Sequence, residues 1–252
     1  MPPITLHMVL ARRLAESLGA EMLAEQAGPY VLGATAPDIR VLTRQDRRST
    51  HFFDLGTMSH QDSVKAFLEE HGELTDPGKL NTETTAFVAG YISHLVFDEQ
   101  YIEEVYRRHF ARHTDIGGAI RANVMDRLLQ FDLDREFGND DEVTRDLCAA
   151  LSCTVENINV GFIETETLER WRQVTYDVAS RNMDWDRMRA MIANHLRRAG
   201  LEEGETMSSF LDALPELLDE TIAHVTSPEI EAYLARSSEA AARAVARYLA
   251  CG

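Results

Sequence analysis

The sequence is poor in cysteine, and the few that it has do not form a recognisable framework. There are three, Cys148, Cys153 and Cys251, and they contain no Cys-x-x-Cys pair. An odd number also leaves one thiol over in any set of disulfides. This excludes a disulfide-rich secreted fold and a cysteine-based zinc site, and it predicts reduced cysteines with structural roles.

Long hydrophobic runs are absent as well. No stretch approaches the ~18 apolar residues that a membrane-spanning helix needs. The first residues, Met-Pro-Pro-Ile-Thr-Leu-His, lack the basic flank, apolar region and cleavage site of a secretory signal. The sequence therefore predicts a cytoplasmic protein with no stable membrane insertion.

Basic residues are scarce in comparison with acidic ones. The chain of 252 residues has 25 Lys and Arg against 42 Asp and Glu, which gives a formal net charge of −17. Such a chain is repelled by nucleic acid and by anionic surfaces. We expect no nucleic-acid partner and a small-molecule or zwitterionic substrate. No feature of the sequence specifies an oligomeric state.

Several common catalytic motifs are missing. The chain contains no Gly-rich phosphate loop, no Gly-x-Ser-x-Gly elbow and no His-Glu-x-x-His helix. It also lacks the contiguous His-Asp pair of the HD phosphohydrolases and the duplicated Glu-x-x-His of di-iron bundles. These absences argue against a nucleotide-binding P-loop protein, a serine hydrolase of the elbow type and a ferritin-like oxidase.

Helical periodicity is present along most of the chain. Leucines at 6, 10, 14 and 18 and Met22 follow a four-residue spacing, which predicts an amphipathic helix over 5–26 that ends at Gly28-Pro29. No β-hairpin signal occurs, and 39–58 is expected to be a loop. Further helices are expected at 30–36, 60–72, 83–110, 116–136, 141–151, 154–180, 184–199, 206–224 and 228–250.

These elements predict an all-α fold, a multi-helix bundle with polar ligands projecting into its core. We expect one all-helical domain over 1–252, because no low-complexity linker or internal repeat divides the chain. Within it, 1–138 would form a metal-binding core and 139–252 a helical C-terminal lobe.

The most informative residues are His94 and Asp98. They lie four residues apart, on one face of a predicted helix, within the apolar segment that begins Gly90-Tyr-Ile-Ser. Polar side chains on such a helix need partners. One partner is a divalent ion, since zinc accepts neutral imidazole and carboxylate. The other is a hydrogen bond between the buried histidine and aspartate, and the residues alone leave both open.

Three more candidate ligands precede this pair, and their order is informative. The segments are His7, then Gly33-Ala-Thr-Ala-Pro37-Asp38-Ile39, then His51-Phe52, then Gly90-Tyr91-Ile-Ser-His94-Leu-Val-Phe-Asp98. This order resembles the zinc-dependent phospholipase C family and the related phospholipase C and nuclease type of helical fold. The resemblance covers roughly residues 4 to 110.

The resemblance implies a metal-dependent hydrolase that cleaves a phosphate ester with metal-activated hydroxide. It implies that Asp38, His51 and His94 hold one zinc ion and that Asp98 bridges toward a second ion bound by His7. Asp38 or Asp98 would help to orient the nucleophile, and both are our candidate catalytic residues. One or two zinc ions are expected, with iron or manganese as other possibilities.

The chain departs from the secreted members of that family in two places. Their mature N-terminal residue is itself a ligand, whereas six residues precede His7 here. Glu104 stands where the resemblance expects a histidine of a third metal site. Both departures favour a mononuclear or dinuclear centre over a trinuclear one.

A basic loop separates two of the candidate ligands. Between Asp38 and His51 the sequence places Arg40, Arg44, Arg47 and Arg48 with a single intervening acid, Asp46. Arginine matches the geometry of a phosphate with two parallel hydrogen bonds. We expect Arg40 and Arg44 to bind the substrate, and the alternative is an ordinary solvated loop.

Two other functions fit the same ligands. One is an iron-dependent enzyme that uses the His/Asp cluster for different chemistry. The other is a non-catalytic helical protein with a structural metal site. Structural zinc sites are closed and four-coordinate, whereas catalytic sites keep a position for water. Five candidate ligands, two of them carboxylates, favour the catalytic kind.

Overall fold

Helices make up the computed structural model, which describes residues 3–111, 113–198, 200 and 204–252. No strand occurs among these residues, so the all-α prediction is confirmed. The α-helices are α1 (Ile4–Leu18), α2 (Glu21–Glu25), α3 (Ala27–Gly33), α4 (Arg40–Thr43), α5 (Arg48–His51), α6 (Ser63–Glu70), α7 (Thr82–Tyr101), α8 (Ala119–Gly138), α9 (Asp141–Ala150), α10 (Thr165–Ala179), α11 (Trp185–Arg198), α12 (Glu205–Asp212), α13 (Leu214–Val225) and α14 (Ser227–Leu249). Shorter turns are the 3-10 helices η1 (Ala36–Ile39), η2 (Gly72–Leu74), η3 (Pro77–Lys79) and η5 (His113–Ile116), and the π-helix η4 (Ile102–Phe110).

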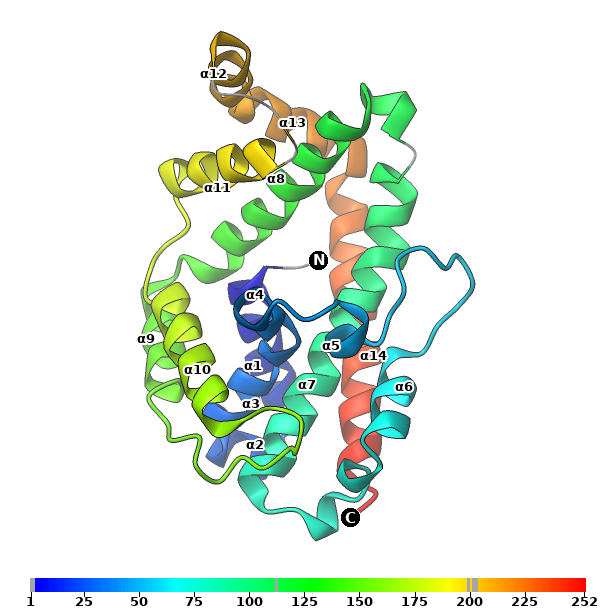
Figure 1. Cartoon of the computed structure of the whole chain (residues 1–252), viewed down its shortest axis with the longest axis vertical. Helices are drawn as coiled ribbons and strands as arrows, with labels where there is room; N and C mark the ends of the chain where they lie inside the picture. Colours follow the sequence, from blue (N-terminus) through cyan, green and yellow to red (C-terminus); the bar gives the residue numbers. More distant parts are fainter. Residues whose placement is uncertain (1–2, 112, 199, 201–203) are drawn as a thin grey trace.

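Helix α7 is the centre of the bundle. It begins at an effective N-cap, because the Asn81 side chain accepts a hydrogen bond of 2.7 Å from the Thr84 N–H. Its residues are buried on nearly every face, as expected for a helix that is apolar all round. Helix α14 packs along it, and α3 and α1 also pack against it (Figure 1).

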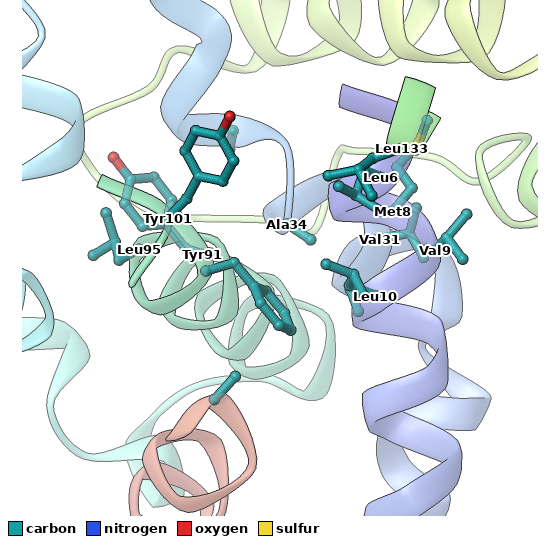
Figure 2. Packing of buried hydrophobic residues seen from close by; sticks show 14 of the residues in the cluster. Leu6, Met8, Val9, Leu10, Val31, Ala34, Tyr91, Leu95, Tyr101 and Leu133 are labelled. Carbon is teal, nitrogen blue, oxygen red and sulfur yellow. The ribbon is translucent and has the colours of Figure 1, made fainter. Parts of the chain in front are cut away.

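The apolar core forms where these helices meet. Figure 2 shows buried side chains from α1, α3 and α7, among them Leu6, Val31 and Tyr91. The same cluster of buried side chains continues to Leu217 and to Tyr248 near the C-terminus. Residues from both parts of the chain therefore share one core, although the proposed division at residue 138 stays a prediction.

Two glycines allow α3 and α7 to approach backbone to backbone. A Cβ atom added to Gly33 would lie 2.0 Å from the Phe87 carbonyl oxygen, and one added to Gly90 would lie 2.0 Å from that of Tyr30. No side chain fits at such distances. This contact fixes the end of α3, and with it the turn that leads to Asp38, against the middle of α7.

The N-terminal helix is shorter than its periodicity predicts. The helix expected over 5–26 stops at Leu18, because Gly19 adopts φ 58° and its N–H bonds to the Glu16 carbonyl. The expected loop over 39–58 contains the short helices α4 and α5. Local periodicity predicts neither feature. A single glycine in the left-handed conformation ends the first helix although the apolar spacing continues, and helices of four residues are too short to show a periodic pattern.

Two of the helices predicted for the C-terminal half have different bounds in the structure. The helix expected over 154–180 begins only at Thr165, and the preceding segment packs against α7 through the Asn157 carbonyl, which accepts from Asn81 Nδ2 at 2.8 Å. The helix expected over 206–224 is divided into α12 and α13, with Pro215 in the first turn of α13.

A carboxylate of α8 holds the start of α1. Asp134 Oδ1 accepts a hydrogen bond of 2.8 Å from the backbone N–H of Leu6, in the first turn of α1. The positive end of a helix favours such a group. Burial nevertheless raises the pKa of Asp134 to about 6. This contact ties α8 to the helix that carries His7.

No helix in the part of the chain that the structure describes is both long and apolar enough to span a membrane.

Replacing Gly90 with alanine tests the contact between α3 and α7. We expect Gly90→Ala to lower the free energy of unfolding by about 1–3 kcal/mol, since the new methyl group has to push the two backbones apart. The intrinsic gain in helix propensity, about 1 kcal/mol, does not offset this cost. Urea denaturation gives the value, and Gly72→Ala, where a Cβ meets nothing within 4 Å, is the control. Equal stability of the two variants would contradict the proposed close packing.

Replacing Asp134 with asparagine tests the buried carboxyl group. Its folded-state pKa, about 6, lies above that of an unfolded aspartate. The wild-type protein therefore loses about 2–3 kcal/mol of stability through this group as the pH rises from about 4 to about 6.5. Asp134→Asn should not show this loss, so its stability relative to the wild type should rise over that range. The exposed Asp219→Asn is the control, and parallel pH profiles for all three proteins would argue against the shifted pKa.

Candidate metal centre

The fold brings the five predicted ligands together in the core. His7 comes from α1, Asp38 from η1, His51 from α5, and His94 and Asp98 from one face of α7. None is more than 6% exposed. Buried polar groups need partners, because their transfer from water is otherwise costly.

Three of these side chains are arranged around one point. The rings of His7 and His94 stack with centroids 3.8 Å apart and an interplanar angle of 14°. Ligand atoms of His7, Asp38 and His94 all lie within 4.8 Å of one another. His51 is adjacent, with its ring centroid 5.2 Å from that of His94. The group is compact enough to share a single ion.

A backbone carbonyl fixes the tautomer of His94. Its Nδ1 lies 2.8 Å from the carbonyl oxygen of Ala34, and a carbonyl can only accept, so Nδ1 carries the proton. The Nε2 atom of His94 then has a free lone pair directed at the cluster. Metal-binding histidines are typically held in this way by a backbone carbonyl or carboxylate.

His51 is held by the hydroxyl group of its neighbour. The hydroxyl oxygen of Thr50 lies 2.9 Å from His51 Nδ1 and 3.3 Å from the Arg47 carbonyl oxygen, which holds the ring in place. His51 Nε2 lies 3.4 Å from His94 Nε2 and 3.5 Å from Asp38 Oδ1. Three groups that can each bind a metal ion therefore face one another.

Other atoms of the cluster have no hydrogen-bond partner within the described part of the chain. Both ring nitrogens of His7 and the Oδ1 atom of Asp98 are buried and unpartnered. Native interiors satisfy nearly all such groups. The His7 imidazole and the Asp98 carboxylate, together with Nε2 of His94, are donors that suit zinc. The residues therefore fit the ion that the sequence implies.

The electrostatics also prepare these groups to bind a cation. Burial lowers the pKa of His7 well below its usual value and that of His94 to about 4, so both rings are neutral near pH 7. Burial alone would raise the pKa of Asp38, but its hydrogen bond with His51 and the nearby histidines bring it below the usual range. The rings of His7 and His94 therefore carry no positive charge that would repel an ion.

Asp98 has an unexpected partner. Its Oδ2 atom accepts a charged hydrogen bond from Arg47 Nη2, and no hydrogen bond joins it to His94. Burial would raise the pKa of Asp98, but the Arg47 charge and smaller contributions from neighbouring groups together bring the pKa to about 2. Arg47 thus neutralises the carboxylate that the resemblance assigns to a bridge between two ions. The hydrogen-bonded His94–Asp98 pair that the sequence left open does not form.

Arg47 is a candidate functional side chain that the sequence alone does not single out. It was one of four arginines in the basic loop, and only its position four residues before His51 could have distinguished it. Its side chain is 11% exposed, and its Nε and Nη1 atoms are buried without partners among the described residues. Two N–H donors next to the cluster are therefore available to another group.

The two arginines chosen from the sequence lie in different surroundings. Arg40 is half-buried and lines the same pocket as Asp38. Arg44 is exposed, ends α4 with φ 62° and does not line that pocket. Glu104, at the position of the third site, pairs with Arg236 of α14, whose Nε lies 2.8 Å from its Oε2. The substrate contacts of Arg40 and Arg44 stay predictions.

Comparison with known proteins gives one relationship. No curated protein matches the chain, and no solved structure matches it. Residues 6–101 match the family described as zinc dependent phospholipase C, and this segment contains all five of the clustered side chains.

Proposed function

We propose that this protein is a zinc-dependent phosphoesterase of the phospholipase C-like class. The observation that carries the proposal is the buried group of His7, Asp38 and His94, in which both imidazoles have unpartnered nitrogens or lone pairs. The family match over residues 6–101 supports a hydrolase that acts on a phosphate ester.

In this proposal His7, Asp38 and His94 hold one zinc ion, and His51 lies close enough to complete the set. When bound, such an ion supplies Lewis acidity to a phosphoryl oxygen and lowers the pKa of a water molecule. A single ion follows from the pairing of Asp98 with Arg47, because the guanidinium group already supplies the positive charge that a second ion would bring.

Other residues of the chain bind the substrate and orient the attacking water. Arg47 offers its free N–H donors to the phosphate of the substrate, while Asp98 keeps the guanidinium in place. The unpartnered Oδ1 atom of Asp98 accepts a hydrogen bond from the attacking water, and Asp38 orients it from the pocket side. Arg40 contacts the substrate at the wall of the same pocket.

Metal content tests the proposal first. We expect the wild-type protein to bind about one equivalent of zinc by elemental analysis. His94→Ala should weaken zinc binding by at least about 100-fold, since it removes a ligand, while circular dichroism shows a folded protein. The control is His224→Ala, because His224 is exposed and lies far from the cluster on α13.

Unchanged zinc content in His94→Ala would refute the site. Iron in place of zinc would instead select the oxidative alternative. Unfolding when the ion is removed would select the structural one.

Variants of the neighbouring residues Arg47 and Arg48 test the proposed contact between Arg47 and the substrate phosphate. Arg47→Gln should lower kcat/KM toward a chromogenic phosphodiester by roughly 10- to 100-fold, the effect of losing a charged hydrogen bond. Arg48→Gln removes the same charge one residue away, from a side chain that is 70% exposed and pairs with Asp54 at the surface. It should stay within about twofold of the wild type. Equal kinetics for the two variants would exclude Arg47 from substrate binding.

A further inference from the structure

A hollow of about 460 Å³ opens beside the candidate metal centre. Asp38 forms part of its wall, together with the first residues of the described chain, the start of α4, and side chains from α8 and α11. Most of this wall lies outside residues 6–101, so the family match does not account for it. Its lining includes four arginines, Arg40, Arg127, Arg187 and Arg198.

None of these four arginines forms an ion pair with a carboxylate in the described part of the chain. The Nε atom of Arg40 is in addition buried with no hydrogen-bond partner. The side chains that line the pocket therefore carry positive charge that no ion pair among the described residues neutralises.

A buried network orients Arg127. Tyr101 donates its hydroxyl proton to Asp126 Oδ1 at 2.8 Å, and Gln130 Nε2 donates to Asp126 Oδ2 at 2.7 Å. The Oε1 atom of Gln130 then lies 3.5 Å from Arg127 Nη1. A neutral amide thus positions the guanidinium group and leaves its other donors for a ligand.

Backbone carbonyls hold Arg187 in a similar way. Its Nη1 donates to the carbonyl of Arg181 at 2.8 Å, which anchors the group without cancelling its charge. The acidic groups facing the arginines are Asp38, the proposed ligand of the ion, and Asp134, whose pKa burial raises to about 6. Four guanidinium groups against two carboxylates, one of them bound to the ion, leave an excess of positive charge.

We propose that this pocket binds a second anionic group of the substrate, a phosphate or a carboxylate, while the scissile phosphate lies at the metal centre. The substrate class is then a phosphate ester with an additional negative charge rather than the zwitterionic ester that the acidic composition suggests. The assignment of the substrate rests on the proposed function, but the binding of an anion by the pocket does not.

Calorimetry with inorganic phosphate tests the pocket without any catalysis. The full-length protein is titrated free of zinc, so that only the arginines can hold the anion. Arg127→Gln and Arg187→Gln should each weaken phosphate binding by about tenfold, and the double variant by about a hundredfold. Arg145→Gln, an exposed change of the same charge on α9, should stay within about twofold of the wild type.

Absence of phosphate binding in the zinc-free wild type would overturn the proposal. So would equal affinities in Arg187→Gln and Arg145→Gln, since Arg187 is half-buried in the pocket wall and Arg145 is exposed on α9.

The zinc-loaded protein then distinguishes the substrate class. Two phosphodiesters are compared that are identical except for the alcohol group. This group carries a negative charge in one ester and is choline-containing in the other. We expect the wild type to favour the anionic ester at least tenfold in kcat/KM, and the double variant to lose this preference. Preference for the choline ester would overturn the assignment. Hydrolysis of neither ester would refute the proposed function, and the phosphate titration would still decide on the pocket.

Discussion

The contact between the backbones of α3 and α7 determines the geometry of everything around it. Gly33 and Gly90 are the residues whose missing side chains allow it. The carbonyl of Ala34, directly after Gly33, reaches His94 one turn beyond Gly90 and sets which of its nitrogens is free. The turn that continues from Ala34 also brings Asp38 to the same point. A wider separation of the helices would disconnect the carbonyl from the imidazole.

The buried cluster combines neutral imidazoles with two carboxylates, and each carboxylate is stabilised differently. Asp38 faces histidines and the space for an ion. Asp98 instead pairs with Arg47, so a permanent cation of the protein stands in the interior beside the candidate metal centre. In the proposed function this arrangement would balance the charge near a single ion, and the unpartnered N–H groups of Arg47 would bind a phosphate.

The C-terminal helices contribute to the same region. Helix α8 fastens the start of α1 through Asp134, and it also carries Arg127. Helix α11 adds Arg187 to the lining of the same pocket. The acidic surface and this basic hollow have complementary roles, because general repulsion of polyanions does not prevent one small anion from binding where guanidinium groups converge.

The sequence by itself determined the helical class, because helix periodicity is a local property. The set of side chains that converge was indicated by the resemblance of its motifs to a known family, and only the spacing of His94 and Asp98 is local. The sequence did not determine the partners of those side chains. The Asp98–Arg47 pair joins residues 51 positions apart, and the carbonyl that holds His94 is 60 positions away. Arg127 and Arg187 come to line one pocket with Asp38 only through the packing of α8 and α11. The tertiary structure decided these contacts, since they depend on how closely helices approach one another, and no short segment of sequence records that distance.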